Sequence, residues 1–392
     1  MNTKTQGHVP RASWSYPTSV HFGAGRIQEL VEHCASVGIT RPLFVTDSFL
    51  ATQDIAKNVV SHLRKSGLPT ELFGNIKSNP SESNVQEGLE VLRAGEHDGV
   101  IAFGGGSALD AGKVIAFMSG QTRSLWDFED IGDWWTRADI NGIAPVVAVP
   151  TTAGTGSEVG RASVITQEST HTKKVIFHPR MMPKITICDP ELTAGMPPRV
   201  TAGTGLDALA HCLEAYCAPS YHPMADGIAM EGIRLIKEYL PRAYHDGLDL
   251  EARAHMMSAA AMGATSFQKG LGAIHALSHP VGAIYDTHHG MTNAVFMPYV
   301  LQFNREAIHE PIKRLSVFIG LKPTFDAFMD WILDLRTELH VPHTLHGLKV
   351  DSDRFHEMAA MAEVDPTAGG NPVRLDRNAA FTLYEASFAG VL

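Results

Sequence analysis

Histidines gather in one short stretch of this 392-residue sequence, from Gly272 to Asn293. The stretch holds four of the twenty histidines in the chain: His275, His279, His288 and His289. On a helix, the first two are one turn apart and share a face. Neutral imidazoles combined with a carboxylate suit a divalent transition metal better than calcium or magnesium. The stretch therefore predicts part of a metal site.

A candidate carboxylate ligand lies upstream, in the motif T-G-L-D-A-L-A-H. Asp207 and His211 are four residues apart, so on a helix both side chains can bind the same ion. One histidine from each pair of the later stretch would complete a set of three or four ligands. A lone histidine is more often a partly buried imidazole than a ligand, but four clustered histidines near an Asp/His pair reverse that preference. The spacing does not choose between neighbouring histidines.

Two loops rich in glycine and hydroxyl groups could hold the phosphates of a nucleotide. The motif G-G-G-S at residues 104–107 lies between a predicted buried strand and a predicted helix, where backbone N–H groups and the helix dipole favour an anion. It matches neither the G-x-G-x-x-G fingerprint nor the Walker A motif, and the alternative is a tight turn capped by Ser107. Three glycines in a row are costly for a turn alone. The second loop, at residues 151–157, also follows a buried strand, and two such loops favour a dinucleotide.

Asp47 ends another predicted strand, at residues 42–47. A carboxylate at the carboxyl end of such a strand can accept hydrogen bonds from the ribose diol of adenosine, and it repels a 2′-phosphate. This position therefore favours NAD over NADP. The alternative is a turn in which the Asp47 side chain accepts hydrogen bonds from the backbone of the following residues.

The first half of the chain alternates between apolar runs of strand length and segments with helical periodicity. This order predicts a parallel, doubly wound sheet that binds its ligand at the carboxyl ends of the strands. Strands are predicted at residues 16–22, 42–47, 70–73, 99–103, 145–150 and 184–189, a hairpin at 159–177, and helices at 27–37, 52–66, 84–95 and 108–118.

The second half of the chain has a different composition, rich in Ala, Leu, Met, Glu and His. Helices are predicted at residues 199–217, 223–247, 249–267, 272–282 and 290–303. A chain of this length is too long for one ordinary core. We therefore expect an α/β dinucleotide-binding domain over residues 1–194 and an all-helical domain, for metal and substrate, over residues 195–392.

The composition excludes several classes of partner. The net charge is −10 and Lys and Arg form no basic run, which argues against nucleic acid. No apolar run approaches the ~20 residues of a membrane span, and residues 1–11 lack the apolar core of a signal peptide. The four cysteines form no C-x-x-C motif and suit a reducing compartment. These features predict a cytoplasmic protein that acts on small molecules.

Four motifs together resemble those of the iron-dependent (group III) alcohol dehydrogenases. They are, in order, G-G-G-S-A-L-D-A-G-K, T-T-A-G-T-G-S-E-V, T-G-L-D-A-L-A-H-C-L-E-A-Y, and H-A-L-S-H-P-V-G followed by H-H-G-M-T-N-A-V-F-M-P-Y-V. The resemblance runs from about Tyr16 to the C-terminal helices. It implies the dehydroquinate synthase-like fold of that family, with an α/β nucleotide-binding domain and an all-helical metal-binding domain. It also implies hydride transfer between NAD and a small primary alcohol or aldehyde, assisted by Fe²⁺.

The resemblance assigns roles that spacing leaves open. The metal ligands it implies are Asp207, His211, His275 and His289, although zinc accepts the same set as iron. His279 is then a catalytic residue beside the substrate and could relay the alcohol proton, with solvent through the cofactor ribose as the alternative. The resemblance implies that His288 is not a ligand and lies either beside the ligands or exposed to solvent. The cofactor residues it implies are Asp47, Gly105, Gly106, Ser107, Asp110, Thr151, Thr152, Thr155 and Lys174.

The segment before the histidine stretch departs from the family pattern. Many simple-alcohol dehydrogenases of the family have Asn and small residues where this chain has Phe267, Gln268 and Lys269. We therefore predict Phe267 and Lys269 near the substrate, and an anionic substrate such as 4-hydroxybutyrate. The alternative for Lys269 is a solvated side chain on a different helix face from the ligands.

Three other functions share this architecture. A zinc polyol dehydrogenase would use the same ligands, while a maleylacetate reductase could work without metal, which the complete Asp/His/His/His set argues against. A lyase like dehydroquinate synthase would need a Lys/Arg-rich substrate pocket, and the metal motifs contain none. The resemblance also implies a homodimer or a higher homo-oligomer, joined through the strand at residues 16–22.

Overall fold

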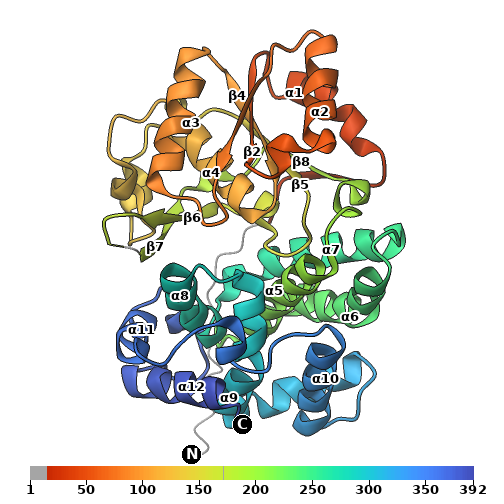
Figure 1. The fold of residues 1–392 in the computed structure, drawn as a ribbon, viewed down its shortest axis with the longest axis vertical. Helices are drawn as coiled ribbons and strands as arrows, with labels where there is room; N and C mark the ends of the chain where they lie inside the picture. The colour runs from red at the N-terminus through yellow and green to blue at the C-terminus, as the bar shows by residue number, and fades with distance from the viewer. Residues whose placement is uncertain (1–15, 171) are drawn as a thin grey trace, which may run out of the picture.

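An α/β domain forms one end of the molecule and a bundle of helices forms the other (Figure 1). The structure is a computed structural model that describes residues 16–170 and 172–392. The predicted absence of a signal peptide concerns residues 1–11, which lie outside the described part of the chain. The two parts are joined by residues 189–197, which include the short 3-10 helix η8 (Pro190–Thr193). The boundary expected after residue 194 falls in this segment.

The α/β domain is built on a six-stranded sheet with the strand order β1-β8-β5-β4-β2-β3. All neighbouring strands in it are parallel. Their carboxyl ends therefore lie at one edge, which is where a doubly wound sheet binds ligands. The strands are β1 (Ser19–Phe22), β2 (Pro42–Asp47), β3 (Glu71–Ile76), β4 (Gly99–Gly104), β5 (Val146–Pro150) and β8 (Ile185–Cys188).

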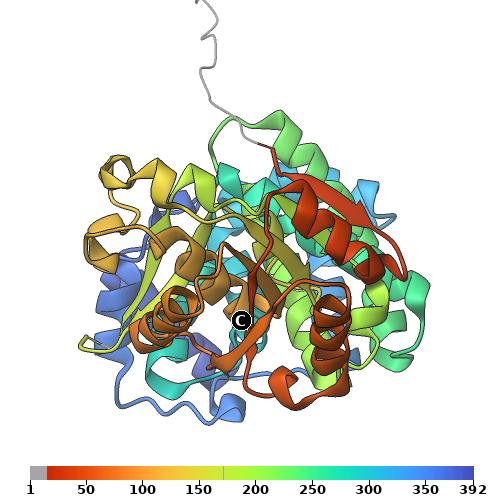
Figure 2. The ribbon, with the colours of Figure 1, turned by 90° about the horizontal axis from the view of Figure 1, so that it is seen from above.

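The two faces of the sheet are covered by different helices because successive side chains of a strand point to opposite sides. Leu43 and Val45 of β2 pack with α3 (Glu82–Ala94) and α4 (Gly106–Met118). Phe44 between them packs with α1 (Leu30–Ser36) and α2 (Asp54–Lys65). Helices lie on both sides of the strands when the molecule is seen from above (Figure 2). The predicted doubly wound arrangement is confirmed.

An antiparallel hairpin extends from the α/β domain toward the helices (Figure 1). It consists of β6 (Ala162–Gln167) and β7 (Thr172–Phe177), and β7 packs against helix α8. The loop after β5 also contacts the helical domain. A Cβ on Gly154 would lie 2.7 Å from the carbonyl oxygen of Thr204, and one on Gly156 would lie 2.5 Å from that of Ala260. Backbone of the two domains thus meets directly at this loop.

The helical domain is arranged around α5, which is buried along nearly its whole length and packs on α6, α7 and α9. One continuous apolar core joins these helices. The helices are α5 (Pro198–Cys217), α6 (Pro223–His245), α7 (Leu250–Ser266), α8 (Ala273–Tyr285), α9 (His289–Phe318), α10 (Phe325–Glu338), α11 (Phe355–Glu363) and α12 (Arg377–Ala389).

Element boundaries differ from the predicted ones in places. The helix predicted at 27–37 begins as a 3-10 turn, η1 (Arg26–Glu29), before α1. The helix predicted to end at residue 303 continues to Phe318, through Pro311. A proline normally ends or kinks a helix, but α9 stays buried on one side as far as Ser316, so tertiary packing overrides the local preference.

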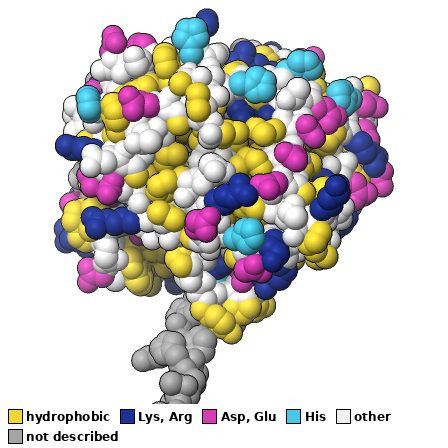
Figure 3. Space-filling view, turned by 90° about the horizontal axis from the view of Figure 1, so that it is seen from below, with side chains coloured by type: hydrophobic (Ala, Val, Ile, Leu, Met, Phe, Trp, Pro, Cys, Tyr) yellow, Lys and Arg dark blue, Asp and Glu magenta, His cyan; other side chains and the backbone are white. Residues whose placement is uncertain are grey.

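No helix among residues 16–170 and 172–392 is long and apolar enough to cross a lipid bilayer. On the face seen from below, acidic and basic side chains are interspersed (Figure 3). Interspersed charges of this kind do not form the single-sign field that attracts a polyanion.

Two glycines inside helices allow the effect of close packing on stability to be distinguished from that of helix propensity. A Cβ on Gly112 of α4 would lie 2.7 Å from Cβ of Ala102 on β4, whereas a Cβ on Gly227 of α6 would meet nothing within 4 Å. We expect Gly112→Ala to lower the free energy of unfolding, because helix and sheet must move apart. Gly227→Ala should raise it by about 0.5–1 kcal/mol through helix propensity. Urea unfolding of both variants is the measurement, and effects of the same sign would contradict the close contact at β4.

Candidate active site

Three side chains with metal-binding atoms converge between α5, α8 and α9. Nε2 of His289 lies 3.7 Å from Oδ1 of Asp207, and Nε2 of His275 lies 4.0 Å from it. The ligand atoms of these residues all lie within 4.8 Å of one another. Asp207 and His275 are buried and His289 is partly buried. The structure thus brings together residues from three helices, as the metal hypothesis requires.

Close packing of α9 on α5 places His289 next to Asp207. Two glycines meet at this contact: a Cβ on Gly290 would lie 2.0 Å from the carbonyl oxygen of Gly203 and 3.0 Å from Cβ of Asp207. Any side chain at residue 290 would force the helices apart. The glycine in the sequence H-H-G-M therefore sets the distance between two candidate ligands.

The fourth predicted ligand, His211, lies one turn further along α5. Its ring stacks on that of His275, with centroids 4.7 Å apart, and its Nδ1 is buried without a hydrogen-bond partner among the described residues. It is not one of the three residues whose ligand atoms lie within 4.8 Å of one another. Burial lowers the pKa of His211 to about 4. Its imidazole is therefore neutral at pH 7, next to the cluster, with a nitrogen lone pair unused.

Glu214, further along the same face of α5, fixes the orientation of His275. Its Oε2 lies 2.6 Å from Nδ1 of His275 and accepts that N–H. In the neutral imidazole, Nε2 then carries the lone pair on the side of Asp207 and His289. Burial lowers the pKa of His275, but the charge and the hydrogen bond of the Glu214 carboxylate outweigh burial and leave the pKa raised. A carboxylate that holds a histidine in this way is a common support for a metal ligand.

The amide nitrogen of Asn293 lies within hydrogen-bond distance of all three converging ligand atoms. Nδ2 donates to Oδ1 of Asp207 at 2.8 Å and lies 3.3 Å from Nε2 of His275 and 3.2 Å from Nε2 of His289. A positively polarised group is thus surrounded by one carboxylate and two imidazoles. The pKa of His289 is lowered by burial first and by neighbouring charges second, so this imidazole is neutral as well. Imidazole and carboxylate donors suit Fe²⁺ or Zn²⁺, and the residues present therefore fit a divalent transition metal.

His279 lies beside the cluster and has its own carboxylate partner. Its ring stacks on that of His289, with centroids 5.4 Å apart and 13° between the planes. Its Nδ1 lies 2.8 Å from Oδ2 of Asp365, whose Oδ1 accepts hydrogen bonds from the backbone N–H and the hydroxyl of Thr367. Burial raises the pKa of Asp365, but His279 and Thr367 outweigh it and leave the pKa lowered. Nε2 of His279 is therefore the nitrogen left for a proton transfer.

His288 supports α9 and lies outside the cluster. Its Nδ1 accepts the N–H of Met291 at 3.4 Å and so caps the helix. Its ring packs on α5, where a Cβ on Gly203 would come 2.7 Å from its Cε1. This position agrees with the expectation that His288 lies beside the ligands.

The two glycine-rich loops meet at the carboxyl ends of β4 and β5. A Cβ on Gly105 would lie 3.2 Å from Cγ2 of Thr152, and one on Gly106 would lie 2.5 Å from Cγ2 of Thr155. The glycines therefore allow the hydroxyl-rich loop to lie directly against the N-terminus of α4. The first N–H groups of a helix have no partner within the helix and, with its dipole, favour a bound anion.

Two more predicted cofactor residues lie at the same edge of the sheet. Thr151 is buried, and its N–H donates to the carbonyl oxygen of Gly104 at 2.9 Å. Ser107, in the first turn of α4, donates its hydroxyl to the carbonyl oxygen of Ser78. Both contacts hold the loops in place, so these residues would act on a phosphate through the backbone they position.

Asp47 adopts the turn considered as the alternative to ribose binding, and it also faces the first loop. Oδ1 accepts the N–H groups of Phe49 at 3.0 Å and Leu50 at 2.9 Å. Oδ2 lies 3.5 Å from the position of a Cβ on Gly104. One oxygen thus stabilises the turn while the other lies next to the loop that would bind a nucleotide.

Asp110 connects parts of the α/β domain, and its role along the pyrophosphate stays a prediction. Its Oδ1 accepts the hydroxyl of Ser157 at 2.5 Å and its Oδ2 accepts the N–H of Val164 at 2.8 Å. Nζ of Lys113 lies 3.3 Å from Oδ1. Both carboxylate oxygens are therefore used to tie α4 to the second loop and to β6, and a carboxylate would in any case repel a phosphate.

Of two adjacent lysines on β7, Lys173 faces α8, whereas Lys174, which was predicted near the cofactor, forms an ion pair within the α/β domain. Nζ of Lys174 pairs with Oε2 of Glu129 at 2.7 Å, within the α/β domain. Lys173 points to the other side of β7, toward α8, where a Cβ on Gly282 would lie 3.0 Å from its Nζ. A shift of one residue along a strand reverses the direction of the side chain.

Lys173 lies beside α8, and charges of both parts of the chain act on its ammonium. Burial lowers its pKa to about 8, while the charges of Asp286, Asp207 and Asp110 counteract burial. Asp207 belongs to the cluster and Asp110 to the α/β domain. Lys173 is also one of the charges that lower the pKa of His289, where burial is the largest cause.

The two residues predicted near the substrate have different surroundings. The ring of Phe267 lies 5.2 Å from that of His211, centroid to centroid, so Phe267 is next to the site. Lys269 ends the 3-10 turn η9 (Phe267–Lys269), and its Nζ is 2.5 Å from Oδ1 of Asp226 and 3.0 Å from the carbonyl oxygen of Tyr216. Its side chain is only 5% exposed. The prediction that Lys269 meets the substrate is wrong, because an ion pair between helices holds its ammonium.

Two family descriptions match almost the whole described chain. "Iron-containing alcohol dehydrogenase" matches residues 17–190, and "Fe-containing alcohol dehydrogenase family, C-terminal" matches residues 201–388. The chain belongs to the iron-containing alcohol dehydrogenase family. The NAD-linked oxidation of alcohols follows from this membership, and the predicted family and reaction class are confirmed.

Relatives of this alcohol dehydrogenase match it over nearly its full length. It is 38% identical to the 4-hydroxybutyrate dehydrogenase of Cupriavidus necator over 367 residues, 91% of this chain and 94% of that protein. The crystal structure of a 1,3-propanediol oxidoreductase superposes with a TM-score of 0.90 at 33% identity, covering 96% of this chain and all of that one. A sulfoacetaldehyde reductase from Bifidobacterium kashiwanohense, solved in complex with NAD⁺, has a TM-score of 0.87 at 28% identity, with 97% and 99% covered. The predicted fold class is confirmed.

Four residues of this dehydrogenase site were not predicted. Glu214 and Asn293 follow predicted ligands by three and four positions on the same helices, and this spacing could have indicated them. Lys173 lies on the opposite face of β7 from the buried Ile176, and alternation along a strand distinguishes it from Lys174 once the strand is known. Asp365 is 86 residues from its histidine partner. No local pattern connects the two.

Proton binding to His211 should destabilise the metal-free dehydrogenase at low pH. Burial lowers its folded pKa to about 4 from the ordinary 6.5, so between these values the unfolded chain binds more protons. The stability that this group contributes is complete above pH 6.5 and is lost as the pH falls toward 4. We expect the urea midpoint of chelator-treated protein to drop across this range, and to drop less in His211→Asn.

A surface histidine provides the control for this pH dependence. His309→Asn changes an exposed imidazole on α9 and should keep the wild-type slope. If His211→Asn had that same slope, the imidazole of His211 would not be held neutral by burial.

Proposed function

We propose that this chain is an iron-dependent dehydrogenase that oxidises a short primary alcohol with NAD⁺ and reduces the matching aldehyde with NADH. The observation that carries the proposal is the convergence of Asp207, His275 and His289 on the helical domain, which meets the loop after β5 directly. Metal and cofactor sites would then lie next to each other, so that one substrate can contact both. Holding reactants in this way removes much of the entropic barrier to reaction.

The proposed metal site uses one carboxylate and three imidazoles. When bound, the metal supplies Lewis-acid stabilisation of the alkoxide and so lowers the pKa of the alcohol. Burial keeps the His211 imidazole neutral, and the hydrogen bond between Nδ1 of His275 and Glu214 orients the ring of His275. Iron is favoured by the family, and zinc is the alternative for this donor set. The ligands would be Asp207, His211, His275 and His289.

The proposed cofactor site lies along the two loops at the carboxyl edge of the sheet. When bound, the nicotinamide ring supplies the hydride acceptor for the alcohol or the donor for the aldehyde. Asp47 beside the first loop favours NAD over NADP, and Lys173 takes the place predicted for Lys174. The backbone and hydroxyl groups that would line the pyrophosphate and the nicotinamide ribose belong to Gly105, Gly106, Ser107, Thr151, Thr152 and Thr155.

His279 is the proposed proton relay. Asp365 accepts a hydrogen bond from its Nδ1, which leaves Nε2 to take the proton that the alcohol releases. Phe267 forms an apolar wall near His211. A route to solvent through the cofactor ribose remains the alternative for the same proton.

The first substrate to test is 4-hydroxybutyrate with its aldehyde, succinic semialdehyde. Support for it comes from the 38% identity to a 4-hydroxybutyrate dehydrogenase. Lys269 is held by Asp226 and does not provide the cation for a carboxylate. The ammonium of Lys173 is a candidate instead, because its charge interacts with both Asp207 and His289 of the cluster.

We also propose a homodimer in a reducing compartment such as the cytoplasm. Strand β1 is at the edge of the sheet and pairs only with β8 among the described strands, and Val20 and Phe22 on it are each 39% exposed. An open edge with apolar side chains can pair with a second chain. The four cysteines have free thiols, which fits a reducing environment.

Net NADH formation from a panel of alcohols tests the proposed function. Protein loaded with Fe²⁺ or Zn²⁺ should oxidise 4-hydroxybutyrate, 1-butanol or 1,3-propanediol. Asp207→Ala removes a coordinating carboxylate, so this variant should not retain the metal, and its kcat/KM should fall at least about 100-fold. Asp330→Ala, at an exposed position of α10, is the control. Full activity of metal-free Asp207→Ala would refute the metal mechanism. A preference for glycerol with zinc would favour a polyol dehydrogenase. If no alcohol gave NADH, a lyase would be favoured.

Single lysine substitutions test whether Lys173 or Lys174 contacts the cofactor, and whether Lys269 contacts the substrate. Lys173→Met should raise the Kd for NADH roughly tenfold, as expected when a charged hydrogen bond worth ~1.5 kcal/mol is lost. Lys174→Met should leave the Kd within about twofold, since its ammonium pairs with Glu129. Lys269→Met should leave the turnover ratio of succinic semialdehyde to butanal unchanged. A larger effect at Lys174 than at Lys173 on NADH fluorescence titration would reverse the assignment.

A further inference from the structure

The carboxylate of Glu214 is shared between a helix terminus and a candidate metal ligand. Its side chain is 5% exposed, and both oxygens are used. Oε1 accepts the backbone N–H of Ile274 at 2.6 Å, and Oε2 accepts Nδ1–H of His275 at 2.6 Å. Asp207 and Glu214 are seven residues apart, two turns of α5, so both carboxylates face α8 from the same side.

The first turn of α8 is capped from outside the helix. Gly272 at its start has no side chain to accept the first N–H groups, which a helix leaves without partners. Glu214 takes the N–H of Ile274, and Oδ1 of Asn371 takes that of Ala273 at 3.1 Å. A Cβ on Gly272 would lie 3.0 Å from Oε1 of Glu214 and 2.9 Å from Oδ1 of Asn371. The glycine therefore lets both acceptors reach the helix.

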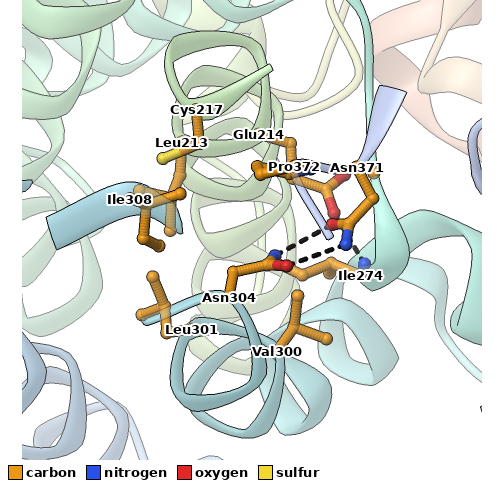
Figure 4. Close-up of a pocket in the computed structure, with 11 residues that line it drawn as sticks. Leu213, Glu214, Cys217, Ile274, Val300, Leu301, Asn304, Ile308, Asn371 and Pro372 are labelled. Carbon is orange, nitrogen blue, oxygen red and sulfur yellow. Dashed lines mark hydrogen bonds between the residues drawn. The ribbon is translucent and has the colours of Figure 1, made fainter. Parts of the chain in front are cut away.

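Asn371 is itself held by a second asparagine. Asn304 of α9 and Asn371 exchange two side-chain hydrogen bonds, at 2.9 and 2.8 Å (Figure 4). Glu214, Asn304 and Asn371 line one small cavity together with apolar residues of α5, α8 and α9. The support of α8 thus has two separable parts: a neutral amide pair that caps the helix, and a carboxylate that also contacts His275.

We propose that Glu214 is a positioning residue that sets the tautomer and ring orientation of His275 and thereby the affinity of the site for its metal. The proposal rests on the proposed function, since it assumes that His275 is a ligand. A neutral imidazole has one protonated and one unprotonated nitrogen. With Nδ1–H donated to Glu214, the lone pair of Nε2 is directed toward Asp207. Without the carboxylate, the ring could rotate or place its proton on the wrong nitrogen.

The other candidate imidazole ligands lack such a support. The buried Nδ1 atoms of His211 and His289 have no hydrogen-bond partner among the described residues. Among these three imidazoles, His275 is therefore the one whose Nδ1 has a carboxylate partner among the described residues. Its ring also stacks on His211 at 4.7 Å, so a displaced His275 would disturb a second candidate ligand.

Metal binding to chelator-treated protein measures the effect. Glu214→Gln keeps the size of the side chain but loses its charge and presents an amide N–H to one of the two donors. We expect its Kd for Zn²⁺, from competition with a chromophoric chelator, to rise about 10- to 100-fold, as for other residues that support metal-bound histidines. Asn371→Ala is the matched control, because it removes a cap of α8 and leaves the contact with His275. It should lower thermal stability and change the Kd for Zn²⁺ less than threefold.

A direct view of the imidazole proton keeps the test independent of how well the variant folds. In Zn²⁺-loaded wild-type protein labelled with ¹⁵N-histidine, Nδ1–H of His275 should appear as a solvent-protected signal that is absent from His275→Asn. Absence of that signal from the wild type, or an unchanged Kd in folded Glu214→Gln, overturns the role of Glu214. Failure of the wild type to bind Zn²⁺ or Fe²⁺ at all would instead overturn the proposed function.

Discussion

Burial of ionisable side chains inside a bundle of helices is the constraint on which the rest of this structure depends. Asp207 and Glu214 lie in the interior of the helical domain, where an unpaired carboxylate would be strongly destabilising. Each is compensated by groups from other helices: Asn293 of α9 donates to Asp207, and the first turn of α8 donates to Glu214. The bonds that make these charges tolerable also determine how α8 and α9 lie on α5. Ligand geometry and helix packing are therefore one set of contacts.

One ammonium group of the α/β domain, that of Lys173, also interacts with these buried charges. Lys173, on a hairpin of that domain, has a pKa that carboxylates from both parts of the chain raise against the effect of burial. Its positive charge also disfavours protonation of His289. A hairpin that lies outside the main sheet and packs against α8 thus takes part in the electrostatics of the helical domain.

The sequence predicted features that depend on the residues of a single helix, strand or loop. It did not predict contacts in which a side chain binds a partner from a distant part of the chain. The helix that carries Asp207 and His211 and the strands that precede the two glycine-rich loops depend on local order, and the structure contains them. Lys269 was misplaced because its ion pair with Asp226 depends on how η9 turns toward α6. Asp365 had no signal at all, since its contact with a histidine on α8 arises only from tertiary packing. Alternation on a strand decides between adjacent lysines, but only once the register of the hairpin is known.

The direct backbone contact between the second glycine-rich loop and the helical domain limits how these enzymes can be recombined. Gly154 and Gly156 leave no room for a side chain between the loop and helices α5 and α7. A chimera cut at the sequence boundary, between residues 189 and 197, would pair a loop shaped for one set of helices with another set. The unit that can be exchanged between relatives is therefore the helical domain together with the loop at residues 151–158, although that loop belongs by sequence to the other half.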